Sequence, residues 1–257
     1  MNLENRVIII MGGTSGIGWS AARYFRKCGA RIFAVGLEDG SIVDDSDPSL
    51  QILYADATLE NTIDEAIELC LESFESIHGL YHVAGGSGRR WGDGPIHSIS
   101  IEAWSKTIQL NLTSVMFSNR GVIKYWLRKR QGGSILNLSS VLATEPSTRF
   151  ATHAYAASKA GVIGLSKSLA TQYAHMGIRV NVLAPGLIET PMSQRALSDQ
   201  VTMDYIGAKQ PLRGSAGKVD DLDMAACYFM SDASSFVTGQ ILKIDGGWSV
   251  SEGHSVS

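Results

Sequence analysis

RVIIIMGGTSGIG, residues 6–18, is the stretch of sequence that decides the fold. Its first half, 6–11, is a run of apolar and mostly β-branched residues, which predicts a buried strand. Gly12, Gly16 and Gly18 follow directly and permit a tight turn, after which a helix is expected to begin near Trp19. A strand, a glycine turn and a helix in this order predict the first β-α unit of a parallel sheet.

The rest of the chain repeats this alternation of short apolar runs and amphipathic stretches. The runs predicted as strands are 6–11, 31–35, 51–55, 79–84, 134–138, 179–183 and 240–244. The clearest helix is 59–74, whose apolar residues, from Leu59 to Phe74, lie along one stripe. We therefore predict an α/β fold, a Rossmann-type doubly wound sheet of about seven parallel strands with helices on both faces. No composition break divides the chain, so residues 1–257 are expected to form a single domain.

Composition excludes several classes of protein. A net charge of −3 provides no broad basic surface, so nucleic acid is not an expected partner. Cys28, Cys70 and Cys227 lie far apart without CxxC spacing, which argues against a zinc site or a disulfide framework and favours a reducing compartment. No apolar run reaches the roughly 18 residues of a membrane span, and the N-terminus enters a strand rather than a signal peptide. A soluble, cytoplasmic protein without a metal site is therefore expected.

The glycine turn also predicts a ligand. Backbone N–H groups in such a turn, at the positive end of a helix, can approach a pyrophosphate. An ordinary strand-to-helix turn is the alternative, but a glycine turn that opens the chain and starts a β-α-β unit favours dinucleotide binding. The turn residues expected to contact the cofactor are Gly12, Thr14, Ser15, Gly16, Ile17 and Gly18.

Two acidic residues are candidates for the adenosine end of the cofactor. Glu38 follows the second strand, where dinucleotide folds usually bind the ribose hydroxyls, and a solvated loop carboxylate is its alternative role. No Lys or Arg occurs in 36–41, and Glu38 and Asp39 would repel a 2′-phosphate, so NAD is favoured over NADP. Asp56, with Ala57 beside it, is a candidate for the adenine contact or for the N-cap of the helix near Leu59.

Tyr155 and Lys159 are the candidates for proton transfer. They lie four residues apart in a helix expected over about 154–174, which places both side chains on one face. Because a free tyrosine titrates near 10, a phenol that exchanges protons near neutral pH needs a cation beside it. Taken alone, the pair also fits a solvated helix face.

Together these motifs resemble the short-chain dehydrogenase/reductase family, over residues 6–248. Tyr155 and Lys159 match its Tyr-x-x-x-Lys pair, Ser140 matches its catalytic serine, and Asn111 matches its active-site asparagine. The positions that match its cofactor motifs are Gly12, Gly16, Gly18, Asp56, Ala84, Gly85, Pro185, Gly186, Ile188 and Thr190.

The resemblance implies an NAD(P)-binding domain that transfers hydride between a nicotinamide and an alcohol or carbonyl carbon. Tyr155 would be the general acid/base, and Lys159, assisted by the positive charge of the oxidised nicotinamide, would lower its pKa. Ser140 would orient the substrate oxygen, and Asn111 would position Lys159 through a water. The family also implies a homodimer or homotetramer, paired through the helix at 154–174.

We expect an NAD-preferring alcohol dehydrogenase or ketoreductase that acts on a small or mid-sized molecule. The first alternative is an NADP-dependent ketoreductase similar to 3-oxoacyl reductases. A second alternative is a dinucleotide-sensing protein without catalysis, although such a sensor has no need for the full set of four catalytic side chains. A sugar-nucleotide epimerase is a third, but the chain is short for that branch.

Two departures from the family pattern concern structure. His82 replaces the first Asn of the usual Asn-Asn-Ala-Gly, and we expect it to take over a structural hydrogen bond. Met11 replaces the usual Thr before the first glycine, with a small structural effect expected.

Three loops, 85–95, 141–152 and 191–217, are expected to select the substrate. The 14 residues between Ser140 and Tyr155 are more than the family usually has, so the loop 141–152 is expected to be enlarged. The loop arginines are candidates for binding an anionic group, with solvated side chains as the alternative: Arg89, Arg90 and Arg149. The candidates for apolar walls or loop anchors are Trp91, Phe150 and Met192.

Overall fold

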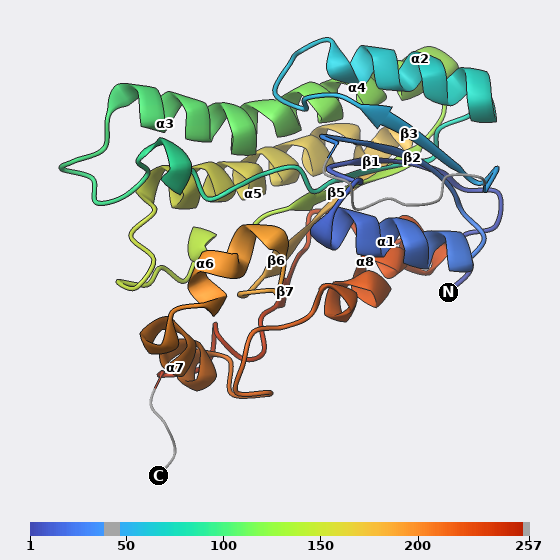
Figure 1. Cartoon of the computed structure of the whole chain (residues 1–257). Helices are drawn as coiled ribbons and strands as arrows, with labels where there is room; N and C mark the ends of the chain where they lie inside the picture. The colour runs from blue at the N-terminus through green and yellow to red at the C-terminus, as the bar shows by residue number, and fades with distance from the viewer. Residues whose placement is uncertain (39–46, 254–257) are drawn as a thin grey trace.

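Seven parallel strands form one sheet in the computed structural model, which describes residues 1–38 and 47–253 (Figure 1). The strands are β1 (Val7–Met11), β2 (Arg31–Gly36), β3 (Leu50–Tyr54), β4 (Gly79–His82), β5 (Gly133–Leu138), β6 (Ile178–Pro185) and β7 (Ile241–Ile244). Their order is β3-β2-β1-β4-β5-β6-β7. The chain thus reverses its direction of winding between β1 and β4, which confirms the doubly wound sheet expected from the sequence.

Helices cover both faces of the sheet (Figure 1). One face packs against α2 (Thr62–Phe74), α4 (Ser114–Lys129) and α5 (His153–Tyr173), and the other against α1 (Gly16–Lys27) and α8 (Asp223–Met230). The remaining α-helices are α3 (Ile101–Ile108), α6 (Gln194–Leu197) and α7 (Gln200–Lys209). None of the helices in the described ranges is both long and apolar enough to span a bilayer.

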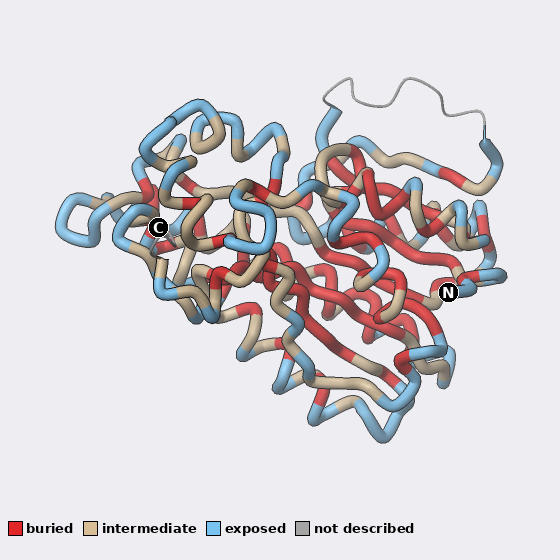
Figure 2. The backbone as a smooth tube through the Cα atoms, turned by 90° about the horizontal axis from the view of Figure 1, so that it is seen from below, coloured by how far each residue is buried: buried red, intermediate tan, exposed pale blue. Residues whose placement is uncertain are grey.

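Alternation along β1 shows how the sheet builds two cores. Val7, Ile9 and Met11 join the core under α2, α4 and α5, whereas Ile8 and Ile10 join the core under α1 and α8. Successive side chains of a strand point to opposite faces, so a strand covered on both sides is apolar throughout. Figure 2 shows the result as buried backbone through the middle of the molecule, with exposed segments at the periphery.

Several boundaries differ from those expected. α1 begins at Gly16 rather than near Trp19, because the glycine turn itself forms the first helical turn. α2 begins at Thr62, and Leu59, expected in its apolar stripe, is 56% exposed in the preceding turn. The segment 191–217, expected as a loop, contains α6 and α7. Most of 37–49, including Asp39, lies outside the described residues.

His82 braces the sheet against α4. Its buried ring lies 2.7 Å from the Ser118 hydroxyl through Nδ1 and 3.3 Å from the Ser114 hydroxyl through Nε2. Burial lowers the pKa of His82 to about 3, so the ring is neutral. Beside it, the amides of Asn119 and Asn137 exchange two hydrogen bonds of 2.9 Å. The structural hydrogen-bonding role expected for His82 is confirmed.

Candidate active site

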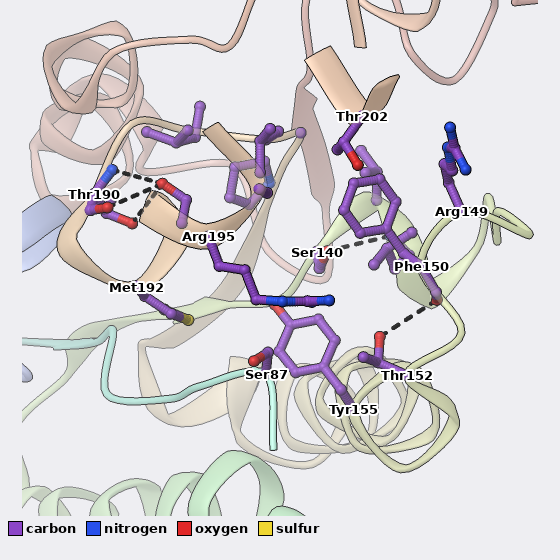
Figure 3. A pocket seen from close by; sticks show the side chains of 18 of the residues that line it. Ser87, Ser140, Arg149, Phe150, Thr152, Tyr155, Thr190, Met192, Arg195 and Thr202 are labelled. Atoms are coloured by element: carbon purple, nitrogen blue, oxygen red, sulfur yellow. Dashed lines mark hydrogen bonds between the residues drawn. The ribbon is translucent and has the colours of Figure 1, made fainter. Parts of the chain in front are cut away.

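A pocket of about 630 Å³ opens at the carboxyl ends of β5 and β6 (Figure 3). Its wall includes Ser140 after β5, Tyr155 at the start of α5 and Thr190 after β6. Ligands of doubly wound sheets bind at this edge, where strand ends and the following loops converge. The pocket is therefore where both the fold and the sequence motifs place the chemistry.

Tyr155 and Lys159 lie one turn apart on α5. The Lys159 Nζ is buried, lies 5.7 Å from the centroid of the Tyr155 ring and donates a 2.8 Å hydrogen bond to the Leu138 carbonyl. One residue beyond Leu138, the Ser139 hydroxyl donates to the Lys159 carbonyl at 2.8 Å. The face of α5 that carries Tyr155 and Lys159 is thus tied directly to the end of β5.

Burial governs the ionisation of both groups. Burial raises the pKa of Tyr155, whereas a hydrogen bond with the Ser140 hydroxyl lowers it. Burial also lowers the pKa of Lys159 to about 8. The sequence analysis expected Lys159, together with the oxidised nicotinamide, to lower the pKa of Tyr155. For the chain by itself, desolvation of the phenol dominates and the pKa is raised.

Ser140 is held where its hydroxyl can reach the phenol. Its backbone is extended, and its Oγ accepts a 3.2 Å hydrogen bond from the Leu142 amide at the start of the 3₁₀ turn Val141–Ala143. This contact uses a lone pair of the oxygen and leaves the hydroxyl proton for donation. Ser140 can therefore donate to an oxygen placed beside Tyr155.

Asn111 lies in a π-helical segment, Gln109–Thr113, between α3 and α4. Its side chain accepts from the Gly86 amide at 2.9 Å and donates to the carbonyls of Gly86 and Thr107 at 2.8 and 3.0 Å. A Cβ placed on Gly85 would lie 2.8 Å from the Asn111 Oδ1 and 3.1 Å from the Lys159 Nζ. Both side chains thus lie next to Gly85, and only glycine fits at this position without a clash. Short π-helical segments often mark functional sites.

Asp93 is a site residue that the sequence analysis did not identify. It is 3% exposed, and its two carboxylate oxygens accept hydrogen bonds of 3.0 Å from the amides of Ala154 and Tyr155. Thr152, the residue at the N-cap of α5, makes no side-chain cap. Asp93 therefore caps the catalytic helix from the loop 85–95, which is 61 residues away in sequence and provides no local capping pattern.

The glycine turn fits a pyrophosphate. Gly12 and Gly16 have positive φ angles of 81° and 51°, and a Cβ on Gly12 would lie 2.6 Å from the Ala84 amide. Ser15, at the N-cap of α1, makes no side-chain cap, and the first turn of α1 contains no acidic residue. The N–H groups and the positive dipole end of α1 are therefore open to an anion.

The adenosine-side candidates lie beyond the pocket. The buried Thr14 donates from Oγ1 to the Leu37 carbonyl at 2.9 Å, which holds the turn against the end of β2, and the exposed Glu38 follows. Asp56 accepts from the Thr58 amide at 2.8 Å, whereas the N-cap of α2 is Asn61. The alternative role of Asp56 as a helix N-cap is therefore wrong.

The pocket brings together some of the expected cofactor residues with the catalytic ones. Those that line it are Ile17, Pro185, Gly186, Ile188 and Thr190, together with Ser140 and Tyr155. The remaining expected contacts lie outside its wall, either behind the catalytic face or toward the adenosine end: Gly12, Thr14, Ser15, Gly16, Gly18, Glu38, Asp56, Ala57, Ala84, Gly85, Asn111 and Lys159. The wall thus matches the nicotinamide and substrate half of the expected site.

All three expected substrate loops contribute to the pocket. Arg89, Arg149, Phe150 and Met192 line it, whereas Arg90 is exposed and stacks on the Trp91 ring at 4.2 Å, away from the wall. Two further wall residues were missed by the sequence analysis, Arg195 and Trp248. The Trp248 ring packs 5.9 Å from those of Phe150 and Tyr205, joining three segments that are distant in sequence.

Comparison with known proteins extends these observations over almost the whole chain. Residues 12–249 match a family model described as enoyl-(acyl carrier protein) reductase. The chain is 32% identical to 3beta-hydroxysteroid dehydrogenase 1 of Eggerthella lenta, covering 98% of this chain and 97% of that protein. It is 31% identical to a 3-oxoacyl-(acyl-carrier-protein) reductase of Chlamydia trachomatis, covering 95% and 98%. A ligand-free aldohexose dehydrogenase of Thermoplasma acidophilum has a similar structure, with a TM-score of 0.86, 29% identity and coverage of 99% and 98%.

These matches include both the glycine turn and the Tyr155 and Lys159 pair, so the similarity is not confined to a dinucleotide-binding half. The named relatives are dehydrogenases and reductases, in agreement with a pocket that places a phenol and a hydroxyl side by side. The chain therefore belongs to the short-chain dehydrogenase/reductase family and is an NAD(P)-dependent oxidoreductase acting on CH–OH groups.

Proposed function

We propose that the protein is an NAD-preferring dehydrogenase or ketoreductase, with Tyr155, Lys159, Ser140 and Asn111 as its catalytic groups. One observation carries this proposal: the Tyr155 phenol and the Ser140 hydroxyl meet at the wall of one pocket, directly above a buried Lys159. The chain, residues 1–257, acts as one NAD(P)-binding domain in this proposal. The segments 85–95, 141–152 and 191–217 select the substrate.

In the oxidation direction, Ser140 donates a hydrogen bond to the substrate oxygen and orients it toward Tyr155. Tyr155 accepts the hydroxyl proton while hydride leaves the carbon, and in reduction it returns that proton. The nicotinamide supplies the hydride acceptor or donor. Lys159 provides a fixed positive charge below the phenol, and Asn111 links it to solvent through a water in the space beside Gly85. Burial of these groups keeps competing water away from the reacting atoms.

The glycine turn and the residues after β6 are proposed to hold the cofactor. The uncapped N-terminus of α1 suits the pyrophosphate, and Ile17, Gly186, Ile188 and Thr190 line the nicotinamide half of the pocket. Glu38 is exposed at the end of β2, where a carboxylate can accept from ribose hydroxyls and repel a 2′-phosphate. This arrangement supports NAD over NADP.

A comparison of initial rates with NAD⁺ and NADP⁺, on a broad alcohol panel, tests the proposed cofactor. We expect kcat/KM to be at least about tenfold higher with NAD⁺, because Glu38 would face an unpaired phosphate in NADP⁺. Glu38→Ser should reduce this preference, and Glu72→Ser serves as a matched loss of one exposed carboxylate away from the expected cofactor contacts. A higher kcat/KM with NADP⁺ would overturn the assignment of Glu38. NADH binding without turnover on any substrate would favour the dinucleotide-sensing alternative.

We also propose a homodimer or homotetramer in the cytoplasm. The family pairs subunits through the helix that corresponds to α5. Three free cysteines, among the residues that the structure describes, fit a reducing compartment. Sedimentation of the purified chain with and without NADH tests the oligomeric state, and a monomer under both conditions would contradict this part of the proposal.

A further inference from the structure

The side chains that line the pocket carry an excess of positive charge. Three arginines line it and each comes from a different segment: Arg89 from the loop after β4, Arg149 from the loop after β5, and Arg195 from α6. Its one carboxylate is Asp199 at the N-cap of α7, whose Oδ2 accepts from the Thr202 amide at 3.1 Å. The wall therefore carries more positive charge than its single acidic residue can balance.

Within the described ranges 1–38 and 47–253, none of these guanidinium groups lies within 4.0 Å of a carboxylate oxygen, although the charges of Arg149 and Arg195 act on Asp199 from farther away. The ion pairs found there involve other cations, and none includes Arg89, Arg149 or Arg195. Asp93 lies near Arg89, but both of its oxygens are used by the amides at the start of α5. Arg89 is half-buried, and a half-buried charge without an ion-pair partner is costly, whereas Arg149 and Arg195 are exposed and free to turn toward a ligand.

The excess of positive charge has its largest effect at Arg89. This residue is half-buried, and both its burial and the positive charge of Arg195 lower the pKa of Arg89. An anion between two guanidinium groups attracts both of them and so offsets their mutual repulsion across the pocket.

Figure 3 shows two of the three arginines, Arg149 and Arg195. The Arg195 side chain extends from α6 into the pocket, over the side on which Tyr155 and Ser87 lie, and Arg149 stands at the rim beyond Phe150. Apolar side chains also line the pocket: Phe150, Met192 and Trp248. A ligand that contacts both kinds of side chain has an anionic group and a hydrocarbon body.

We propose that the substrate is a hydroxy acid or oxo acid whose carboxylate is bound by Arg195 and Arg89, with Arg149 at the rim. The forked donors of arginine can bind both oxygens of a planar carboxylate at once. This assignment rests on the proposed function for its chemical step. The secondary alcohol gives a hydride from carbon to the oxidised nicotinamide and its hydroxyl proton to Tyr155, so the products are an oxo acid, the reduced cofactor and a proton.

The test uses pairs of compounds that differ only in charge. Initial rates are measured with NADH and a series of linear oxo acids, in which two to six bonds separate the carbonyl from the carboxylate, and with their methyl esters. We expect at least one acid to have a kcat/KM about tenfold or more above that of its ester, because charge-assisted hydrogen bonds are lost in the ester. Equal rates for every acid and ester pair would overturn the proposal.

Variants then locate the anion. Arg195→Gln and Arg89→Gln should each raise KM for the preferred acid about tenfold or more, with little change for the ester. Arg90→Gln is the matched control, because it removes the same charge from the neighbouring position, where the side chain stacks on Trp91 outside the pocket. A loss of NADH affinity in Arg195→Gln, with the acid unaffected, would assign that arginine to the cofactor and overturn its role here.

A binding measurement separates this proposal from the proposed redox function. Tyr155→Phe, saturated with NADH, is titrated by calorimetry with the preferred oxo acid and with the matching phosphate monoester. Binding of the acid that is lost in Tyr155→Phe/Arg195→Gln supports the anion site even if the native chain turns over no substrate. Tighter binding of the phosphate monoester than of any carboxylate would overturn the choice of a carboxylate.

Discussion

The two sides of the pocket differ in how their side chains are held. On the catalytic side, Lys159, Asn111 and Asp93 are at most 3% exposed and are hydrogen-bonded to backbone groups of other segments. On the substrate side, Met192 is 56% exposed, and Arg195 lies exposed on the four-residue helix α6. In the proposed function, the reaction is therefore built into the core, whereas the choice of substrate depends on side chains that the fold does not need. Substitutions on the substrate side can change specificity at little cost in stability.

Tyr155→Phe is the most direct test of this difference between the two sides of the pocket. The change removes one hydroxyl from the catalytic side, and we expect kcat to fall by roughly 10²–10⁴, the usual contribution of a general acid or base. NADH affinity should stay the same, because the ring remains in place. Stopped-flow measurement of a single turnover gives the rate of the chemical step.

Tyr205→Phe is the matched control for that experiment. Tyr205 also contributes a phenol near the pocket, where its oxygen accepts a 2.8 Å hydrogen bond from Ser147 and its ring packs on Trp248. It lies on the substrate side, so its loss should affect KM rather than the chemical step. Similar losses of single-turnover rate in both variants would mean that the catalytic side is not distinct.

Lys159 provides a test of how strongly the catalytic side is buried. Its pKa is lowered to about 8 in the folded chain, so between about pH 8 and its ordinary value the unfolded chain binds a proton that the folded chain does not. In this window the free energy of unfolding rises with pH, by up to about 1.4 kcal/mol per pH unit. Below pH 8 the ammonium is charged in both states, and its burial then costs the full amount.

Lys159→Met removes this pH dependence while keeping an unbranched side chain. Urea unfolding of both chains at pH 7.5, 8.5 and 9.5 should show the native chain gaining stability relative to the variant as pH rises. The pH dependence of the stability difference decides the test. Lost packing and the unpaired Leu138 carbonyl lower the stability of the variant equally at all three pH values. An unchanged difference across the range would mean that Lys159 is solvated, contrary to the described geometry.

Local patterns were sufficient to predict two features of the fold. Helical spacing places Tyr155 and Lys159 on one face of α5, and the continuous apolar run in β1 predicts a strand covered on both sides. The glycine turn predicted the start of α1 only approximately, because the capping geometry, not the apolar pattern, decides that the helix begins at Gly16. Leu59 was misplaced for the same reason, since the stripe continued into a turn.

Contacts between distant segments could not be predicted. Asp93 caps a helix that begins 60 residues later, and no spacing rule relates the two. Arg195 joins the pocket only because α6 and α7 fold where a loop was expected. The pKa of Tyr155 depends on burial by the whole tertiary structure, which the pair of residues does not reveal.

Asp93 links a substrate loop to the helix that carries Tyr155, so it tests how far the two sides are separate. It comes from the loop 85–95 but binds the first amides of the catalytic helix. Asp93→Ala should reduce the free energy of unfolding by about 0.5–2 kcal/mol, the usual value of a helix cap, as measured by urea titration. It should also lower kcat, because the Tyr155 amide loses its anchor and the phenol its fixed position.

Thr152→Ala and Asp93→Asn separate these two effects. Thr152 stands at the N-cap of α5 without capping it and donates only a 3.4 Å hydrogen bond to the Phe150 carbonyl, so its loss should lower stability and kcat less than Asp93→Ala does. Asp93→Asn retains one acceptor oxygen and should recover part of the kcat, with its pH profile unaltered because Asp93 touches no reacting atom. If Asp93→Ala lowers stability while kcat stays at the native value, the cap supports only the fold. The position of Tyr155 must then be set by the Lys159 and Ser139 contacts on the next turn of α5.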